Sequence, residues 1–258
     1  MQQHNQPGLK YALCIESIFP GMDYAERIQH TINTGFNAVE VWGVDDAKKK
    51  VLLDAKERGV RTAFLVGPRG FATNDKNHIT QELETLKRHI DLAHELDCPN
   101  ICLFVGDRDP NLIYDQGRAA VIDFLDQAAK VLSGSGVTGV VESLSPANHP
   151  KGFASSMRDV IAWVREVNRP EIQLQFDVYH TAMTDPDVET LVRDNIDITA
   201  YYQAADAPGR AQPGTGILNF DRILNTIKES TFDGYFSWEY APQGDAIESI
   251  EQTKKIQI

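Results

Sequence analysis

The sequence predicts a single α/β domain of the (β/α)8 class, the TIM barrel. Eight short apolar or β-branched runs alternate with longer stretches, several of which have the periodicity of amphipathic helices. The length of 258 residues matches one such barrel, which typically has about 250. No long Pro, Gly or Ser linker interrupts the alternation. We therefore expect residues 1–258 to form one closed parallel barrel rather than an open doubly wound sheet.

The expected strands are runs of four to eight residues rich in Val, Ile, Leu and aromatic side chains. In chain order they are YALCIE (11–16), AVEVW (38–42), VRTAFLV (60–66), NICLFV (100–105), VTGVVE (137–142), IQLQFD (172–177), ITAYYQ (198–203) and YFSWE (235–239).

Amphipathic helices are expected between these runs. The clearest is 78–97, where apolar residues recur at spacings of three and four. The stretch 118–132 repeats this pattern before the glycine-containing stop SGSG, and 155–167 opens with serines suited to capping a helix. The sixth unit offers only a short helical candidate, at 184–195. Such apolar faces are expected to pack on the sheet.

Charge and cysteine content limit the partners and the compartment. Lys and Arg number 25 against 37 Asp and Glu, and the formal charge of −12 repels phosphate backbones, so no nucleic-acid partner is expected. The three cysteines form no paired framework and are expected to be buried in a protein of the reducing cytoplasm. The opening lacks signal-peptide regions, and no apolar run approaches the roughly 18 residues that span a bilayer. We therefore expect a cytoplasmic protein without a membrane partner.

Four oxygen-bearing side chains end the last four predicted strands: Glu142, Asp177, Gln203 and Glu239. One strand-end carboxylate is more often a helix cap or turn former than a ligand. Recurrence on four consecutive strands changes this, because several carboxylates buried at one barrel mouth are strongly unfavourable without a cation. Oxygen ligands suit Mg²⁺ or Mn²⁺, whereas zinc sites usually recruit histidine or cysteine. The pattern therefore predicts one divalent ion, Mn²⁺ or Mg²⁺.

Four segments resemble the hydroxypyruvate isomerase branch of the xylose isomerase-like TIM-barrel superfamily, which contains sugar isomerases and epimerases. They are VVESLSPANHP (140–150), FDVYH (176–180), YYQAADAPGRAQPGTGILNF (201–220) and FDGYFSWEYAP (232–242). The resemblance implies that Glu142, Asp177, Gln203 and Glu239 bind the metal and that the two glutamates transfer protons. Many members of this branch carry a further charged residue after PGR, where this chain has Ala211 and Gln212. The family resemblance is also compatible with either a homodimer or a homotetramer.

Substrate-binding residues follow from the same segments. The resemblance implies that His180 and Arg210 grip substrate oxygens and that Asn148 contacts the substrate or a neighbouring site residue. The planar guanidinium of Arg210 suits a carboxylate or a diol. Glu40 ends the second predicted strand, and two roles fit this position: orienting substrate or a metal ligand at the barrel mouth, or a structural ion pair.

The predicted chemistry is proton transfer beside a metal-bound carbonyl. A divalent ion acidifies the neighbouring C–H and stabilises the enediolate, while Glu142 or Glu239 removes and returns the proton. Return to the adjacent carbon converts hydroxypyruvate to tartronate semialdehyde, the leading prediction, or interconverts an aldose and a ketose. Return of the proton to the same carbon from the opposite face gives an epimer, and the enzyme would then be a ketose 3-epimerase.

Two other classes of protein are built on such a barrel. A DNA-repair endonuclease needs a histidine-rich multi-zinc cluster and a basic groove, and this acidic sequence offers neither. A catalytically silent sugar-binding or assembly subunit remains open, although the presence of both Glu142 and Glu239 argues against it.

Overall fold

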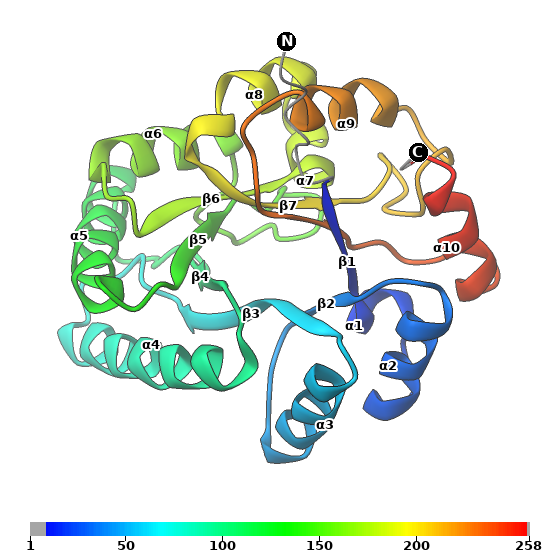
Figure 1. The fold of residues 1–258 in the computed structure, drawn as a ribbon. Coiled ribbons are helices and arrows are strands. Elements are labelled where there is room, and N and C mark those ends of the chain that lie inside the picture. The colour runs from blue at the N-terminus through cyan, green and yellow to red at the C-terminus, as the bar shows by residue number, and fades with distance from the viewer. Residues whose placement is uncertain (1–8, 257–258) are drawn as a thin grey trace, which may run out of the picture.

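The computed structural model describes residues 9–256, which form a closed barrel of eight parallel strands (Figure 1). Neighbouring strands pair in chain order, and β8 pairs with β1 to close the sheet. The strands are β1 (Lys10–Cys14), β2 (Ala38–Val41), β3 (Arg61–Arg69), β4 (Asn100–Phe104), β5 (Thr138–Glu142), β6 (Ile172–Asp177), β7 (Thr199–Ala204) and β8 (Tyr235–Trp238). The predicted (β/α)8 barrel is confirmed.

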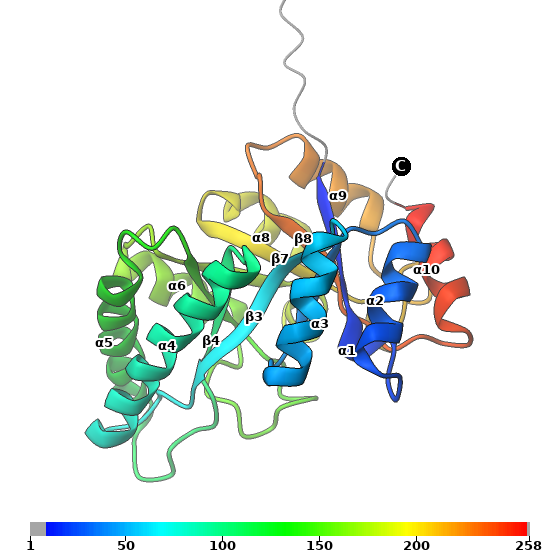
Figure 2. The same cartoon turned by 60° about the horizontal axis from the view of Figure 1, so that its bottom comes forward.

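The longer helices form a layer around the barrel (Figure 2). The helices are α1 (Ile15–Ile18), α2 (Tyr24–Asn33), α3 (Asp46–Glu57), α4 (Lys76–Leu96), α5 (Tyr114–Leu132), α6 (Met157–Val167), α7 (Val178–Ala182), α8 (Val188–Asp194), the 3₁₀ turn η1 (Ile196–Ile198), α9 (Phe220–Lys228) and α10 (Ala246–Lys254). The short helix predicted for the sixth unit is α8, which has seven residues.

Helix starts in this chain rely mainly on aspartate. The side chains of Asp23, Asp45, Asp75 and Asp245 accept hydrogen bonds from backbone N–H groups in the first turns of α2, α3, α4 and α10. Ser156 stands at the start of α6, but its side chain makes no capping hydrogen bond. The serine capping expected there is therefore not made by the side chain.

Several element boundaries differ from the sequence prediction, and β3 runs to Arg69, three residues beyond the predicted end at 66. The first strand ends at Cys14 instead of residue 16, because Ile15–Ile18 turns into α1. The carboxylate of Glu16 accepts hydrogen bonds from the Tyr24 hydroxyl and, at 3.2 Å, from the Trp42 N–H, which holds this turn. Helix α5 begins at Tyr114, four residues before the predicted start at 118.

The core has two layers. Inside the barrel lie mostly small side chains with a few large rings: Ala12, Ala38, Ala63, Phe64, Cys102, Val140 and Tyr201. The second layer packs the outer face of the barrel against the helices, and within it the rings of Phe71 and Phe124 stack with centroids 4.1 Å apart. Phe71 lies just beyond the end of β3, so this contact fixes the chain where it leaves that strand.

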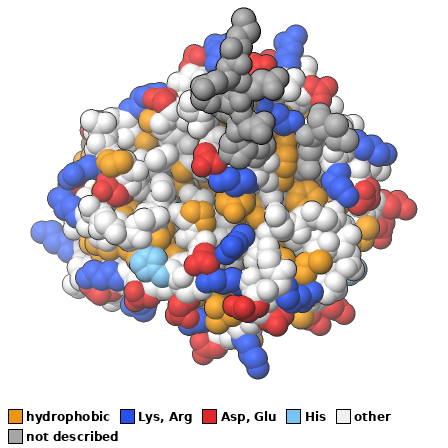
Figure 3. All heavy atoms as spheres, viewed as in Figure 1, with side chains coloured by type: hydrophobic (Ala, Val, Ile, Leu, Met, Phe, Trp, Pro, Cys, Tyr) orange, Lys and Arg blue, Asp and Glu red, His pale blue; other side chains and the backbone are white. Residues whose placement is uncertain are grey.

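The cysteines and the surface agree with the expectations for a reduced, acidic chain. Cys14, Cys98 and Cys102 are buried and unpaired. Acidic and basic side chains are interspersed on the face drawn in Figure 3. Across residues 9–256, every helix is too short or too polar to cross a membrane.

Phe124→Ala should destabilise the protein by about 3–5 kcal/mol, because a fully buried ring leaves a cavity between α5 and the segment after β3. Ile113→Ala, at a side chain that is 67% exposed just before the same helix, should change the stability by less than about 0.5 kcal/mol. Urea unfolding of both variants measures this difference. Equal midpoints would show that the Phe71–Phe124 contact does not stabilise the barrel.

Candidate active site

The four predicted metal ligands lie together at the carboxyl ends of β5 to β8. Asp177 and Gln203 are partners in the β6–β7 register, so their side chains leave the sheet at the same level. Glu142 ends the neighbouring strand β5, and Glu239 directly follows β8. Glu142, Gln203 and Glu239 line one cavity of about 330 Å³. Parallel strands bring their carboxyl ends to one face, which explains this convergence.

His180 joins this acidic group from the start of α7. Glu142, Asp177 and His180 each present one potential ligand atom, and these atoms lie within 4.8 Å of one another. Asp177 also accepts the backbone N–H of His180 at 2.8 Å, because it caps α7. Glu239 lies within a second group of three, with Cys14 and Glu40. The three predicted carboxylate ligands therefore meet at one mouth but fall into two separate clusters, Glu142 and Asp177 in one and Glu239 in the other.

Burial is the main influence on these carboxyl groups. It raises the pKa of Glu142 well above its usual value, and the charges of Asp177 and Glu239 add to the shift. Burial also raises the pKa of Asp177 to about 6 and that of Glu239 to about 7, while the Arg210 guanidinium opposes both shifts. The guanidinium of Arg210 thus faces three carboxyl groups, two of them buried and that of Glu142 half-buried.

This imbalance fits a divalent cation. Three carboxylates can ionise together at neutral pH only if positive charge is added, and Arg210 supplies a single unit. Glu142, Asp177, Gln203 and Glu239 offer oxygen donors, the type that Mg²⁺ and Mn²⁺ prefer. The residues present are therefore suited to hold such an ion.

Arg210 is held against Glu239. Its Nη2 donates to Oε2 of Glu239 at 2.9 Å, and the Glu239 side chain is only 6% exposed. The guanidinium also lies over the ring of Tyr179, 5.4 Å from the centroid. Arg210 thus lines the cavity with its charge already balanced by one carboxylate.

The loop that carries Arg210 is built around Asp206. The buried Asp206 carboxylate accepts four backbone hydrogen bonds, from Ala207, Gly214, Gly216 and Leu218, at 2.8–3.1 Å. A Cβ atom on Gly216 would lie 2.1 Å from the carbonyl oxygen of Ala207, so only glycine fits there. The PGRAQPGTG segment (208–216) is therefore a loop that positions Arg210.

Ala211 and Gln212 contribute to the same loop and not to the cavity wall. The backbone oxygen of Ala211 accepts the N–H of Asp206 at 2.8 Å. Gln212 is buried, and its amide exchanges hydrogen bonds with the backbone of Gln243 and donates to Gln252 of α10. The two positions that depart from the family pattern thus have structural contacts: Ala211 bonds within the loop, and Gln212 joins the loop to α10.

His180 presents a free hydrogen-bond donor. Its Nδ1 accepts the backbone N–H of Ser145 at 3.1 Å, so in the neutral ring Nε2 carries the hydrogen. Nε2 is buried without a partner among the described residues. Burial, with help from the Arg210 charge, lowers the pKa of His180 to about 2, which keeps the ring neutral. An N–H in this state suits a substrate oxygen better than a metal ion.

Glu40 is fully buried below the mouth. It is not one of the residues that line the cavity, and it forms no ion pair within residues 9–256. Its two oxygens accept hydrogen bonds from Nε2 of Gln203 at 2.6 Å and from the Tyr201 hydroxyl at 2.9 Å. Since Glu40 takes the amide nitrogen, the carbonyl oxygen of Gln203 points the other way, where Nε2 of Gln175 donates to it. Of the two roles predicted for Glu40, the contacts favour orienting a metal ligand.

Asn148 also lies outside the cavity lining. Its Oδ1 accepts hydrogen bonds from the hydroxyls of Ser145 and Tyr179, each at 3.0 Å. Ser145 contacts His180, and Tyr179 lies under Arg210, so Asn148 braces both of these residues. A direct contact of Asn148 with substrate stays a prediction.

The sequence interpretation missed three residues of the site. Gln175 lines the cavity and has a buried Oε1 without a partner among the described residues. It lies two residues before Asp177 on β6, and because alternate residues of a strand share a face, this spacing could have identified it. Asp206 and Arg69 were missed as well. No local sequence pattern identifies the backbone N–H groups that donate to Asp206, because they lie up to 12 residues after it in the chain.

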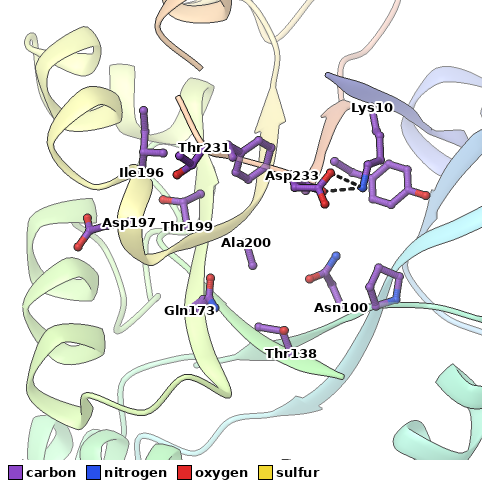
Figure 4. Close-up of a pocket in the computed structure, with 14 residues that line it drawn as sticks. Lys10, Asn100, Thr138, Gln173, Ile196, Asp197, Thr199, Ala200, Thr231 and Asp233 are labelled. Carbon is purple, nitrogen blue, oxygen red and sulfur yellow. Dashed lines mark hydrogen bonds and ion pairs between the residues drawn. The ribbon is translucent and has the colours of Figure 1, made fainter. Parts of the chain in front are cut away.

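A second cavity, of about 360 Å³, lies at the opposite, amino-terminal end of the barrel (Figure 4). It is lined by residues at the starts of strands, including Asn100, Thr138 and Thr199. Its lysine, Lys10, pairs with Asp233 at 2.8 Å. Barrels of this class carry their active sites at the carboxyl ends of the strands, so the candidate site is the cavity that contains Glu142 and Glu239.

Fold and site together define a TIM barrel with an acidic, metal-suited mouth. The chain belongs to the xylose isomerase-like TIM barrel family, whose sequence model matches residues 28–256. The predicted resemblance is therefore confirmed.

Relatives cover nearly the whole chain. A "putative hydroxypyruvate isomerase" of Homo sapiens is 26% identical over 257 residues, which are 94% of this chain and 93% of that protein. The 2-oxo-tetronate isomerase of Pectobacterium atrosepticum is 24% identical over 243 residues, 91% of this chain and 93% of that protein. The crystal structure of an AP endonuclease, family 2, from Brucella melitensis has a TM-score of 0.87 at 23% identity, covers 96% of this chain and 98% of its own, and shows the shared fold alone.

Metal-free protein should lose stability as the pH rises from about 4.5 to about 8. The pKa values of Glu239 and Glu40 are raised from 4.5 to about 7 and about 8, so the folded state binds more protons than the unfolded state in this window. Thermal unfolding across this range measures the slope, and Glu40→Gln should make it shallower. A melting temperature that rises with pH would show that these groups are ionised without cost.

Asp206→Ala should loosen the Arg210 loop and destabilise the protein by about 2–4 kcal/mol, because four backbone N–H groups lose their acceptor. Asp206→Asn should do nearly as much, since either amide orientation turns an NH₂ group toward backbone donors. Thermal melting and limited proteolysis within residues 207–218 report the change, with Asp91→Ala on α4 as the control. An unchanged melting temperature for both variants would contradict this role.

Proposed function

We propose that this protein is a divalent-metal-dependent isomerase that acts on a small hydroxy-carbonyl compound, with hydroxypyruvate to tartronate semialdehyde as the leading reaction. The observation that carries the proposal is the pair of carboxyl groups, the half-buried Glu142 and the buried Glu239, on one cavity beside Arg210. The names of the relatives, which act on hydroxypyruvate and 2-oxo-tetronate, support the same class of reaction.

Glu142, Asp177, Gln203 and Glu239 would hold the cation, Mn²⁺ or Mg²⁺. Once bound, it would supply Lewis-acid polarisation of a substrate carbonyl and compensate the negative charge that develops when a neighbouring proton leaves. Glu40 contributes by fixing the amide of Gln203, because it accepts the Nε2 hydrogen and so turns the carbonyl oxygen, which accepts from Gln175 in this structure, to the side where it would act as a ligand.

The protein side chains then move the proton. Glu239 lines the cavity beside Arg210, where its carboxyl group would remove or return a substrate proton. Glu142 lines the same cavity from β5 and is the partner that removes or returns a proton. Arg210 stabilises the ionised form of Glu239 through their 2.9 Å hydrogen bond. The Nε2–H of His180 is available to a substrate oxygen.

The walls of the cavity restrict water. Trp42, Phe64 and Phe104 contribute aromatic surface on the β2 to β4 side. An apolar wall strengthens the electrostatic interactions of the carboxylates and protects a reactive carbanion-like species from stray protons. A cavity of about 330 Å³ is at the small end of the range for small-molecule sites, which fits a short substrate.

Ketose 3-epimerisation and a sugar-binding subunit without activity are the alternatives. An NMR screen of hydroxypyruvate and common ketoses with Mg²⁺ in D₂O separates them. Isomerisation would place deuterium on the carbon that was originally the carbonyl, epimerisation would invert one neighbouring carbon and place deuterium there, and a silent subunit would leave every compound unchanged.

Glu142→Gln and Glu239→Gln should each lower kcat by about 10²–10⁴-fold, because each removes a group that transfers protons. Glu57→Gln, at an exposed carboxylate on α3, should leave kcat unchanged. Removal of divalent ions with a chelator should abolish turnover, and Mg²⁺ or Mn²⁺ should restore it. Full turnover in the chelated protein would refute the metal-dependent mechanism, and a near-normal rate in either glutamate variant would remove that residue from it.

A further inference from the structure

Two arginines line the active-site cavity from opposite sides. Arg210 lies in the loop after β7, and Arg69 is the last residue of β3. In a closed barrel whose eight strands pair in chain order, β3 and β7 face each other across the mouth. The two guanidinium groups therefore belong to opposite walls.

The two arginines differ in their partners. Arg210 is engaged by Glu239 and packs over Tyr179. The guanidinium of Arg69, by contrast, makes no hydrogen bond and no ion pair with any residue in the range 9–256. Its backbone is nevertheless fixed, because its N–H donates to Glu82 at 2.8 Å and its carbonyl oxygen contacts His78 Nε2 at 3.1 Å. Arg69 is thus a firmly anchored residue with an uncommitted charge.

The Arg69 charge stands on an otherwise apolar wall. The cavity lining contributed by β2 to β4 and the residues just after them consists of Trp42, Phe64, Val66, Arg69, Cys102 and Phe104. Arg69 lies on the same wall as the buried Cys102, whose raised thiol pKa the Arg69 charge opposes, and Arg69 itself is solvent-exposed. Neutral hydroxyl groups find few polar partners on this side.

The opposite wall carries the reacting groups. Glu142, Gln203 and Glu239 line the cavity from β5, β7 and β8. A substrate whose carbonyl end lies among them must direct its other end across a small cavity, toward the wall that holds Arg69. An anion there would gain a charge-assisted, bidentate hydrogen bond, which is the strongest interaction this wall offers.

We propose that Arg69 binds the carboxylate of the substrate and thereby selects hydroxy-carbonyl acids over neutral sugars. This inference rests on the proposed function, because it assigns the acid end of the same substrate. In this arrangement Arg69 binds the substrate carboxylate, and Arg210 remains paired with Glu239.

Binding of two matched probes tests the proposal without turnover. Erythronate and erythritol are four-carbon polyols that differ chiefly in a terminal carboxylate. The Mg²⁺-loaded wild-type protein should bind erythronate more tightly than erythritol in isothermal titration. Arg69→Met, which keeps the length of the side chain but removes the charge, should weaken erythronate binding by about 10- to 100-fold and leave erythritol within twofold. Arg69→Lys should recover part of the loss.

Arg88→Met, on the outer helix α4, is the matched control and should bind both probes like the wild type. The proposal is overturned if wild-type protein binds erythronate no more tightly than erythritol, if Arg69→Met leaves erythronate binding within twofold, or if it weakens both probes equally. The last result would mark a structural role for Arg69. Circular dichroism and melting temperatures confirm that each variant is folded.

Failure of the proposed function gives a different result. If erythronate binding depends on Arg69 but no hydroxy-carbonyl acid is converted, the isomerase proposal fails and the binding role of Arg69 stands. If hydroxypyruvate is converted and Arg69→Met leaves its KM unchanged, the isomerase stands and the role of Arg69 fails. An increase in KM of about 10-fold or more for the acid, without a matching change for a neutral ketose, supports both.

Discussion

The structure of the mouth depends on one electrostatic constraint, the crowding of three carboxyl groups, the buried Asp177 and Glu239 and the half-buried Glu142, around the guanidinium of Arg210. Carboxylates cannot all ionise in such a place without more positive charge, so their protons are retained or a cation is bound. The same constraint requires that Arg210 stay where it is. The Asp206-centred loop meets this need, because its backbone hydrogen bonds hold Arg210 beside Glu239.

Beneath the mouth, hydrogen bonds orient the groups above them. Inside the barrel, the Tyr201 hydroxyl donates to Glu40, and Glu40 accepts the amide N–H of Gln203. The carbonyl oxygen of Gln203 in turn accepts from Gln175. Ser145 similarly determines which nitrogen of His180 carries the hydrogen. Strands place these side chains, and the buried network selects which atom each one presents. Such positioning is what a catalytic site needs, because misoriented amides or rings offer the wrong atom to a ligand.

The cavity is chemically asymmetric. The side formed by β5 to β8 carries carboxyl and amide groups, whereas the side formed by β2 to β4 is apolar apart from Arg69. Reaction chemistry and substrate recognition thus occupy different strands. In a closed barrel the two sets of strands face each other, so one short ligand touches both.

The sequence alone determined the barrel, the family and the four strand-end oxygens. These features are local: apolar runs mark strands, spacing leaves room for helices, and the last residue of a parallel strand lies at the mouth. Boundaries such as the turn at Glu16 escaped prediction, because that residue is held by Tyr24 and Trp42 and not by its neighbours.

Only the tertiary structure decided which side chains meet. Glu40 contacts Gln203 across 163 residues, and no spacing in the sequence connects them. Barrel closure also set Arg69 opposite Arg210, and within residues 9–256 the guanidinium of Arg69 has no polar partner, whereas that of Arg210 pairs with Glu239. The sequence states which charges exist and on which strands, but their pairing depends on distances that only the closed sheet creates.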